Sequence, residues 1–147
     1  MSSIDLTQRP PRSPRVRLGS FVLLPRILDK CRATLAGKNG DYKFNCPLDR
    51  QFFDFTQVDA EAFKAEVKTG KTDGEMLAWV QKNAGRKVAP FEAVAWSTHQ
   101  EQRAPSDAET REYFTDLHKQ AGSNREDIAT WFDLLDLDDF VSYGGKA

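Results

Sequence analysis

Three segments of the sequence begin with a Ser or Thr that is followed three residues later by Glu. The pairs are Thr72 with Glu75, Ser106 with Glu109, and Ser123 with Glu126. In such a capping box each side chain accepts a hydrogen bond from the backbone of the other residue, which satisfies two amides that the first helical turn leaves unpaired. Because apolar residues follow each pair, the sequence predicts three helix starts and a chain built mainly from α-helices.

Apolar spacing predicts where the first helix lies and which side it buries. A proline suits a helix start and a glycine its end, which places this helix over residues 25–37. One stripe has the i, i+3, i+4 and i+7 spacing of a buried face: Leu24, Ile27, Leu28, Cys31 and Leu35. Cys31 is therefore expected in the core, whereas Arg26, Asp29 and Lys30 are expected on an exposed polar face.

Further signals complete the predicted fold. Pro90 opens a helix between the first two capping boxes, Asp59 is a good N-cap for an earlier helix, and Pro47 opens a short helical segment. A chain of 147 residues fits one domain with one core. We therefore expect a mainly α, single compact domain of about five to seven short helices, with short antiparallel connections.

The composition of the two ends sets the expected boundaries. Residues 1–17 contain Pro10, Pro11 and Pro14 with four arginines, which disfavours a helix or a central strand. We predict an extended Arg/Pro-rich arm over residues 1–17, a helical domain over 18–140 and a C-terminal tail over 141–147.

Charge is separated between the two ends of the chain, although the formal net charge is only -1. Residues 1–32 hold seven bases against two acids, a net of +5, and residues 126–147 hold six acids against one base, a net of -5. Opposite patches attract where screening is incomplete, so the ends are expected to meet within one chain or across a dimer. The alternative is two unrelated, solvated charge runs. If they meet, Arg15 or Arg17 would hold an acid of the closing segment.

Common catalytic and cofactor motifs are missing from the sequence. It contains no G-x-S-x-G, no phosphate-binding loop and no dinucleotide-binding loop, so we assign no catalytic residue and no cofactor. Cys46 beside Pro47 stands at a predicted helix start, which is a weak signal of reactivity.

Metal binding is also not indicated. His99 and His118 have no carboxylate one helical turn away, and the aspartates from Asp133 to Asp139 lack the glycine turn and distant Glu of a calcium loop. We expect these aspartates to pair with arm arginines and assign no metal site.

Two features bear on location. The two cysteines are too few for a disulfide framework, and no apolar run is long enough to span a bilayer. We expect a soluble cytoplasmic protein with no membrane association.

Several strings resemble one known family. They are Ser13-Pro14-Arg15, Leu24 to Ala33, Thr72 to Glu75 leading to Trp79, Trp96, and the closing Trp131 to Asp138. Together they resemble the uncharacterised bacterial family called domain of unknown function 5069, over roughly residues 13–140. The resemblance implies a small, stand-alone, mostly helical bacterial protein and supplies no activity. This chain departs from the family at Ser97, where Asn is frequent, and at Asp139 to Val141, where the family often has Glu-Gly-Arg.

These observations favour a non-enzymatic binding or protein-interaction domain, acting as a homodimer or with a protein partner. One alternative is a small enzyme whose polar site is assembled from several helices. Another is nucleic-acid binding through the arm, which the pI of about 6.1 disfavours. The candidate binding residues are Arg15, Arg17, Arg26, Asp29, Arg32, His99 and Asp136.

Overall fold

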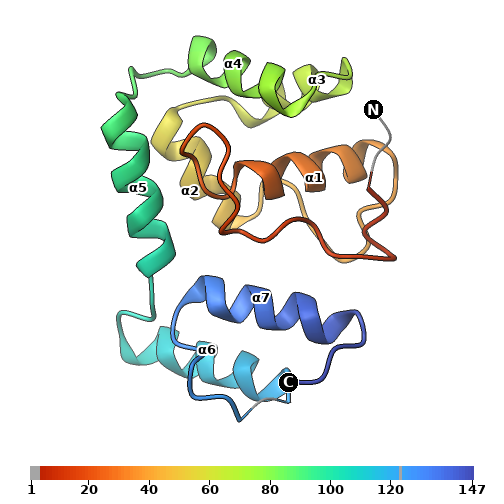
Figure 1. Cartoon of the computed structure of the whole chain (residues 1–147), viewed down its shortest axis with the longest axis vertical. Helices are drawn as coiled ribbons and strands as arrows, with labels where there is room; N and C mark the ends of the chain where they lie inside the picture. The colour runs from red at the N-terminus through yellow and green to blue at the C-terminus, as the bar shows by residue number, and fades with distance from the viewer. Residues whose placement is uncertain (1–3, 123) are drawn as a thin grey trace.

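A computed structural model describes residues 4–122 and 124–147 of the chain. In these residues it contains seven helices: α1 (Leu24–Leu35), α2 (Pro47–Thr56), α3 (Ala60–Lys68), α4 (Asp73–Asn83), α5 (Pro90–Gln102), α6 (Ala108–Gln120) and α7 (Trp131–Ser142). Extended pairing in the same residues is limited to one bridge between Leu18 and Phe21. The prediction of a mainly α single domain is confirmed (Figure 1).

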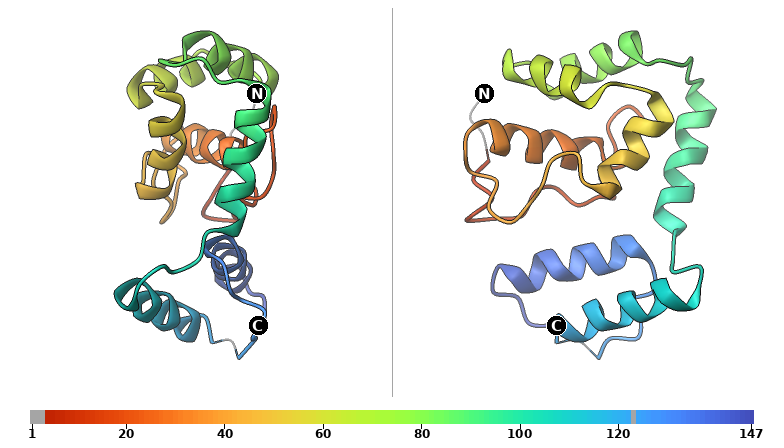
Figure 2. Two further views of the ribbon diagram at one scale, coloured as in Figure 1. Left: turned by 90° about the vertical axis from the view of Figure 1, so that its left-hand side faces the viewer. Right: turned by 180° about the vertical axis from the view of Figure 1, so that it is seen from behind.

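The seven helices form an upper group and a lower pair. Helices α1 to α4 pack together, α5 runs down one side, and α6 and α7 lie side by side below them (Figures 1 and 2). These last two helices run in the same direction, so the expected antiparallel connection is wrong for this pair, because residues 124–130 carry the chain back to the start of α6. The main core contains buried aromatic rings from α2, α3, α7 and the loop before α1: Phe52, Phe53, Phe63, Phe132 and Phe21. Large rings allow a chain with few apolar residues to bury enough surface for one core.

Helix α7 belongs to two hydrophobic clusters. Phe132 is fully buried in the main core, whereas Leu134 and Leu137 pack with Phe114 of α6 and Ile128 in a smaller second cluster. Because opposite sides of α7 are buried in different clusters, this helix joins the lower pair of helices to the rest of the domain.

The helix starts show which capping signals operate. Thr72 and Glu75 form the predicted capping box at α4. The box predicted at Ser106 is wrong: Asp107 caps α6 instead, where its carboxylate accepts a 2.7 Å hydrogen bond from the Thr110 amide. A carboxylate one residue later competes with the Ser106 hydroxyl and is at least as good an N-cap.

The last helix begins later than predicted. Ser123 lies outside the described residues, and Glu126 precedes the helix rather than entering it. Thr130 is the N-cap of α7 and forms a capping box with Asp133. Asp133 also accepts the Ala129 amide at 3.0 Å, so one carboxylate satisfies two backbone amides before the helix.

The described part of the arm runs between α1 and α7 without regular secondary structure, and turns at residues 6–8 and 14–15 interrupt its course (Figure 1). Leu6 is 1% exposed, and its amide donates to the Lys38 carbonyl at 2.9 Å. Further along, the Pro14 carbonyl accepts the Leu23 amide at 3.0 Å. The arm is therefore ordered by backbone hydrogen bonds as well as by its arginines. At the other end, α7 continues to Ser142, two residues into the predicted tail.

Candidate functional site

The polar side of α1 is covered rather than exposed. Arg26, Asp29 and Lys30 are 3%, 1% and 3% exposed, so the prediction of an exposed polar face is wrong. The arm, helix α2 and helix α7 each supply a partner to one of them. Buried charges require such partners, and a sequence pattern read on one helix shows only the charges. Leu35 of the predicted apolar stripe is 37% exposed, since it lies in the last turn of α1.

Asp29 and Arg32 belong to a four-residue charge network. Asp29 accepts three hydrogen bonds from Arg12, from its amide, Nε and Nη2, at 2.9 to 3.0 Å. Arg12 and Arg32 both also pair with Asp73 at the start of α4, each at 2.7 Å. Partial burial alone would raise the pKa of Asp73, but hydrogen bonds from the two guanidinium groups lower it. This network joins the arm to α1 and α4.

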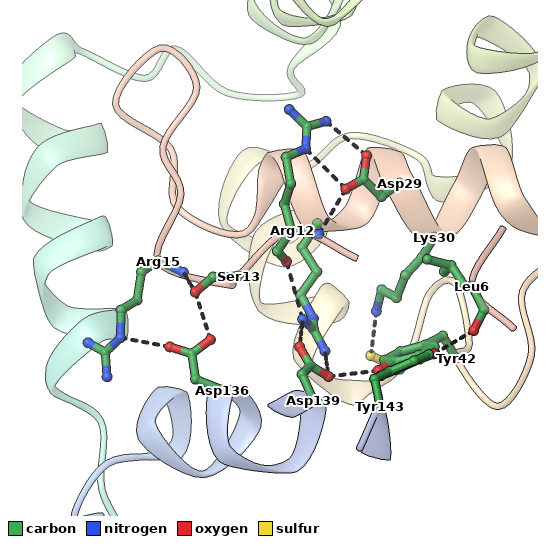
Figure 3. Close-up of polar contacts among 12 residues, drawn as sticks. Leu6, Arg12, Ser13, Arg15, Asp29, Lys30, Tyr42, Asp136, Asp139 and Tyr143 are labelled. Carbon is green, nitrogen blue, oxygen red and sulfur yellow. Dashed lines mark hydrogen bonds and ion pairs between the residues drawn. The ribbon is translucent and has the colours of Figure 1, made fainter. Parts of the chain in front are cut away.

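Arg26 reaches across to the last helix. Its Nη1 lies 2.8 Å from Asp139 Oδ2, and Tyr42 donates its hydroxyl to Asp139 Oδ1 at 2.7 Å (Figure 3). Burial, together with this hydrogen bond to Asp139, raises the pKa of Tyr42 well above its usual range, so the phenol stays protonated. Tyr143 donates to the Leu6 carbonyl at 2.5 Å. The end of α7 is thus tied to α1, to the loop before α2 and to the arm.

The predicted pairing of the arm with the acidic close is present in the structure. Arg15 contacts both Asp133 and Asp136, and Ser13 donates to Asp136 at 2.7 Å (Figure 3). Arg17 pairs instead with Glu101 of α5. Neither arginine is buried, so these contacts position the arm without filling a pocket. The charged ends meet within one chain.

A polar cavity of about 910 Å³ opens beside the C-terminal end of α7. Among the candidate binding residues predicted from the sequence, only Arg26 lines it, and the exposed His99 of α5 does not. Its other polar lining residues come from α1, the loop before α2, and the end of the chain: Lys30, Asp41, Tyr42, Lys43, Cys46, Asp138, Ser142 and Tyr143.

Cys46, Lys30 and Asp49 form a compact cluster at this cavity. The Lys30 ammonium donates to Asp49 Oδ1 at 2.8 Å and to the Lys43 carbonyl at 3.1 Å. It also donates to Cys46 Sγ at 3.4 Å (Figure 3). Pro47 starts α2 and makes Cys46 its N-cap. Asn45, in the left-handed region with φ 61°, turns the chain so that its amide donates to Asp49 at 2.9 Å.

An apolar cavity of about 610 Å³ adjoins the polar one. The two share five lining residues: Leu48, Tyr113, Leu135, Asp138 and Ser142. The remaining apolar lining comes mainly from the α6–α7 pair, including Leu117, Ala121, Trp131, Leu134 and Val141. Partial desolvation, reinforced by the neighbouring Asp139 carboxylate, raises the pKa of Asp138 at the boundary of the two cavities. The combined cleft therefore has one polar and one apolar end.

Most residues of this cleft were missed in the sequence because they come from four separate segments. The one available signal was Cys46-Pro47, which marks a cysteine at a helix start. In the described part of the chain, no group of three or more His, Cys, Asp or Glu side chains is arranged to hold a metal ion, and no helix is long and apolar enough to cross a membrane.

Comparison with known protein families gives a match over most of the chain. The family model described as domain of unknown function (DUF5069) matches residues 8–141. These residues include the arm from Gln8 onward, all seven helices except the last residue of α7, and most of the cleft. A search of curated proteins gives no match.

Proposed function

We propose that the chain, which belongs to the DUF5069 family, binds a small amphiphilic molecule in the cleft between the α6–α7 pair and the rest of the domain. The observation that carries this proposal is the continuity of the two cavities through five shared lining residues. A single ligand can therefore contact the apolar and the polar end together.

The apolar end suits a hydrocarbon or aromatic group. Its volume of about 610 Å³ lies within the range typical of small-molecule pockets, and its walls are mostly aliphatic and aromatic. Trp131 and Tyr113 add flat surfaces, with ring centroids 6.4 Å apart. Burying an apolar group here would release water from both surfaces, which is the main source of affinity in such sites.

The polar end suits a hydrogen-bonding head group of low net charge. Its lining carries three cations, Arg26, Lys30 and Lys43, and two carboxylates, Asp41 and Asp138. Arg26 and Lys30 are already paired with the buried Asp139 and Asp49. Because no strong field of one sign is left, we expect the site to favour a neutral or zwitterionic head over a fully anionic or cationic one.

The other functions considered have less support. Three arginines of the arm are each paired with carboxylates, so they are better placed to hold the arm on the domain than to bind nucleic acid: Arg12, Arg15 and Arg17.

We propose a cytoplasmic location in a bacterial cell. The cysteines Cys31 and Cys46 are both free thiols, as a reducing compartment would keep them, and the bacterial source follows from the family resemblance.

Titration with three amphiphiles of equal chain length tests the proposal: a monoglyceride, a fatty acid and an alkylamine. We expect the monoglyceride to bind and to change the fluorescence of Trp131, which lines the apolar cavity. Ala121→Trp fills that cavity and should abolish binding, whereas Ala78→Trp, on an exposed position of α4, should not. Equal binding by both variants, or no binding by the native chain, would refute the proposal.

A further inference from the structure

Cys46 differs from every other nucleophilic side chain in the cleft, because its sulfur is one of three acceptors of a buried ammonium. We propose that Cys46 is a nucleophilic thiol that forms a reversible mixed disulfide with a small-molecule disulfide entering the polar cavity. This inference rests on the proposed function in one respect only, that the cavity admits a small molecule.

Lys30 provides a fixed positive charge beside the sulfur. Its side chain is 4% exposed, and Asp49, which is 0% exposed, holds the ammonium at 2.8 Å. With its other donors directed at Asp49 and the Lys43 carbonyl, the ammonium cannot turn away from Cys46 without losing a buried hydrogen bond. A cation held beside a cysteine in this way is typical of thiols that react as thiolates.

Helix α2 adds to the same effect. Cys46 is its N-cap, and no side chain caps this helix. The amides of the first turn and the helix dipole therefore place partial positive charge near the sulfur. Cys46 is also partly exposed and lines the cavity, so a reagent can reach it.

Cys31 provides an internal contrast in the same chain. It is 0% exposed in the main core, and burial raises its pKa to about 12. A neutral, enclosed thiol reacts slowly, so the fold separates one inert cysteine from one accessible cysteine.

The reaction follows ordinary thiol–disulfide exchange. Cys46 loses its thiol proton to solvent, its sulfur attacks one sulfur of the small disulfide, and the bond between the two reagent sulfurs breaks. The second reagent sulfur leaves as a thiolate and takes a proton from solvent. Lys30 stays protonated and acts as a positioning residue. Excess small thiol reverses the reaction by the same steps.

The first test compares the native chain with the same chain unfolded in urea, using 2-hydroxyethyl disulfide and mass spectrometry of the intact protein. We expect Cys46 to react about tenfold faster at neutral pH in the native chain, because only the folded chain holds the Lys30 ammonium and the start of α2 beside the sulfur. Cys31 should stay unmodified while the chain is folded. A native rate no higher than the unfolded rate would overturn the proposal, and this measurement needs no variant.

Substitution of Lys30 tests the positioning role. In Lys30→Gln the rate should fall toward the unfolded value, and the midpoint of the rate–pH profile should move to higher pH. Lys68→Gln is the control, since that lysine is exposed on α3 and does not line the cleft. If Lys30→Gln does not fold, the double variant Lys30→Met with Asp49→Leu removes the buried pair without leaving a charge. An unchanged profile in the folded Lys30 variant would contradict the proposed role.

A pair of reagents separates this inference from the proposed function. Methyl methanethiosulfonate needs only the reactive thiol, whereas octyl methanethiosulfonate also gains from the apolar cavity. Fast, Lys30-dependent modification by the methyl reagent with no gain for the octyl reagent would support the thiol site and contradict amphiphile binding. Slow modification by both would overturn the thiol site, and the amphiphile titration would decide the binding function independently.

Discussion

Asp139 in α7 and Arg26 in α1 form an ion pair of 2.8 Å across the domain, with side chains that are 9% and 4% exposed. The same carboxylate accepts the Tyr42 hydroxyl at 2.7 Å. One buried acid thus connects the first helix, the loop before α2 and the last helix, and it lies directly behind the polar end of the cleft.

Removing one partner of this pair should destabilise the chain strongly. Asp139→Ala leaves the buried Arg26 charge without its carboxylate and should lower the free energy of unfolding by about 3 to 5 kcal/mol. Arg50→Ala breaks the exposed pair with Asp54 and should cost less than about 1 kcal/mol. Urea unfolding followed by circular dichroism measures both. Similar losses of unfolding free energy in the two variants would show that the buried pair stabilises the chain no more than an exposed pair does.

Acid should weaken the fold through Asp73 and Asp133. Hydrogen bonds from Arg12 and Arg32 lower the pKa of Asp73, and those from the Thr130 and Ala129 amides lower that of Asp133, in each case against the effect of burial. As the pH falls, these two carboxylates therefore take up protons at a higher pH in the unfolded chain than in the folded chain. Their stabilisation is complete above the unfolded pKa of 3.8 and is lost as the pH falls through the lower folded values. Urea titrations from pH 6 downward should show this loss, and Asp73→Asn should reduce it.

The ionised form of Asp138 should destabilise the folded chain, in contrast to the carboxylates of Asp73 and Asp133. Its pKa is raised, first by desolvation and then by Asp139, so its charged form costs stability above the folded pKa. Asp138→Asn should therefore stabilise the chain at pH 7, by less than about 1 kcal/mol because solvent screens an exposed carboxylate. The gain should shrink as the pH falls through the folded pKa and vanish below 3.8, where both states are protonated. Thermal unfolding at pH 7 and pH 3 checks the sign, and a stabilisation that persists at pH 3 would rule out this cause.

The sequence predicted the elements of the fold better than the site. Local signals such as Thr72 with Glu75 or the stripe from Leu24 to Cys31 act within one or two helical turns, so they can be read directly from the chain. The polar residues of α1 could not be interpreted in that way. Whether Lys30 is exposed depends on Asp49, a residue of another element, and periodicity along one helix contains no information about such a partner.

The same limit explains why most residues of the cleft could not be predicted from the sequence. The pairing of an arm arginine, Arg15 or Arg17, with an acid of the closing segment could be predicted because the opposite charge of the two ends is visible in the composition, and the structure has this pair at Arg15. Charge separation along the sequence does not mark Cys46 or Tyr143, since the cavity they line arises only when the end of α7 packs against the loop before α2.

The arm should stabilise the fold mainly through Arg12. Asp29 is 1% exposed and accepts the Arg12 amide, Nε and Nη2, so Arg12→Ala removes two of these three hydrogen bonds and leaves a buried carboxylate poorly paired. We expect a loss of about 3 kcal/mol in the free energy of unfolding, at the lower end for a broken buried pair because the backbone amide remains. Arg17→Ala, in the same arm, breaks only a partly exposed pair with Glu101 and should cost less than about 1 kcal/mol. Arg12→Lys should recover only part of the loss, because a single ammonium cannot reproduce the bidentate contact with Asp29 while also reaching Asp73. Equal stability of Arg12→Lys and the native chain would mean that charge alone, and not the guanidinium geometry, holds the arm on α1.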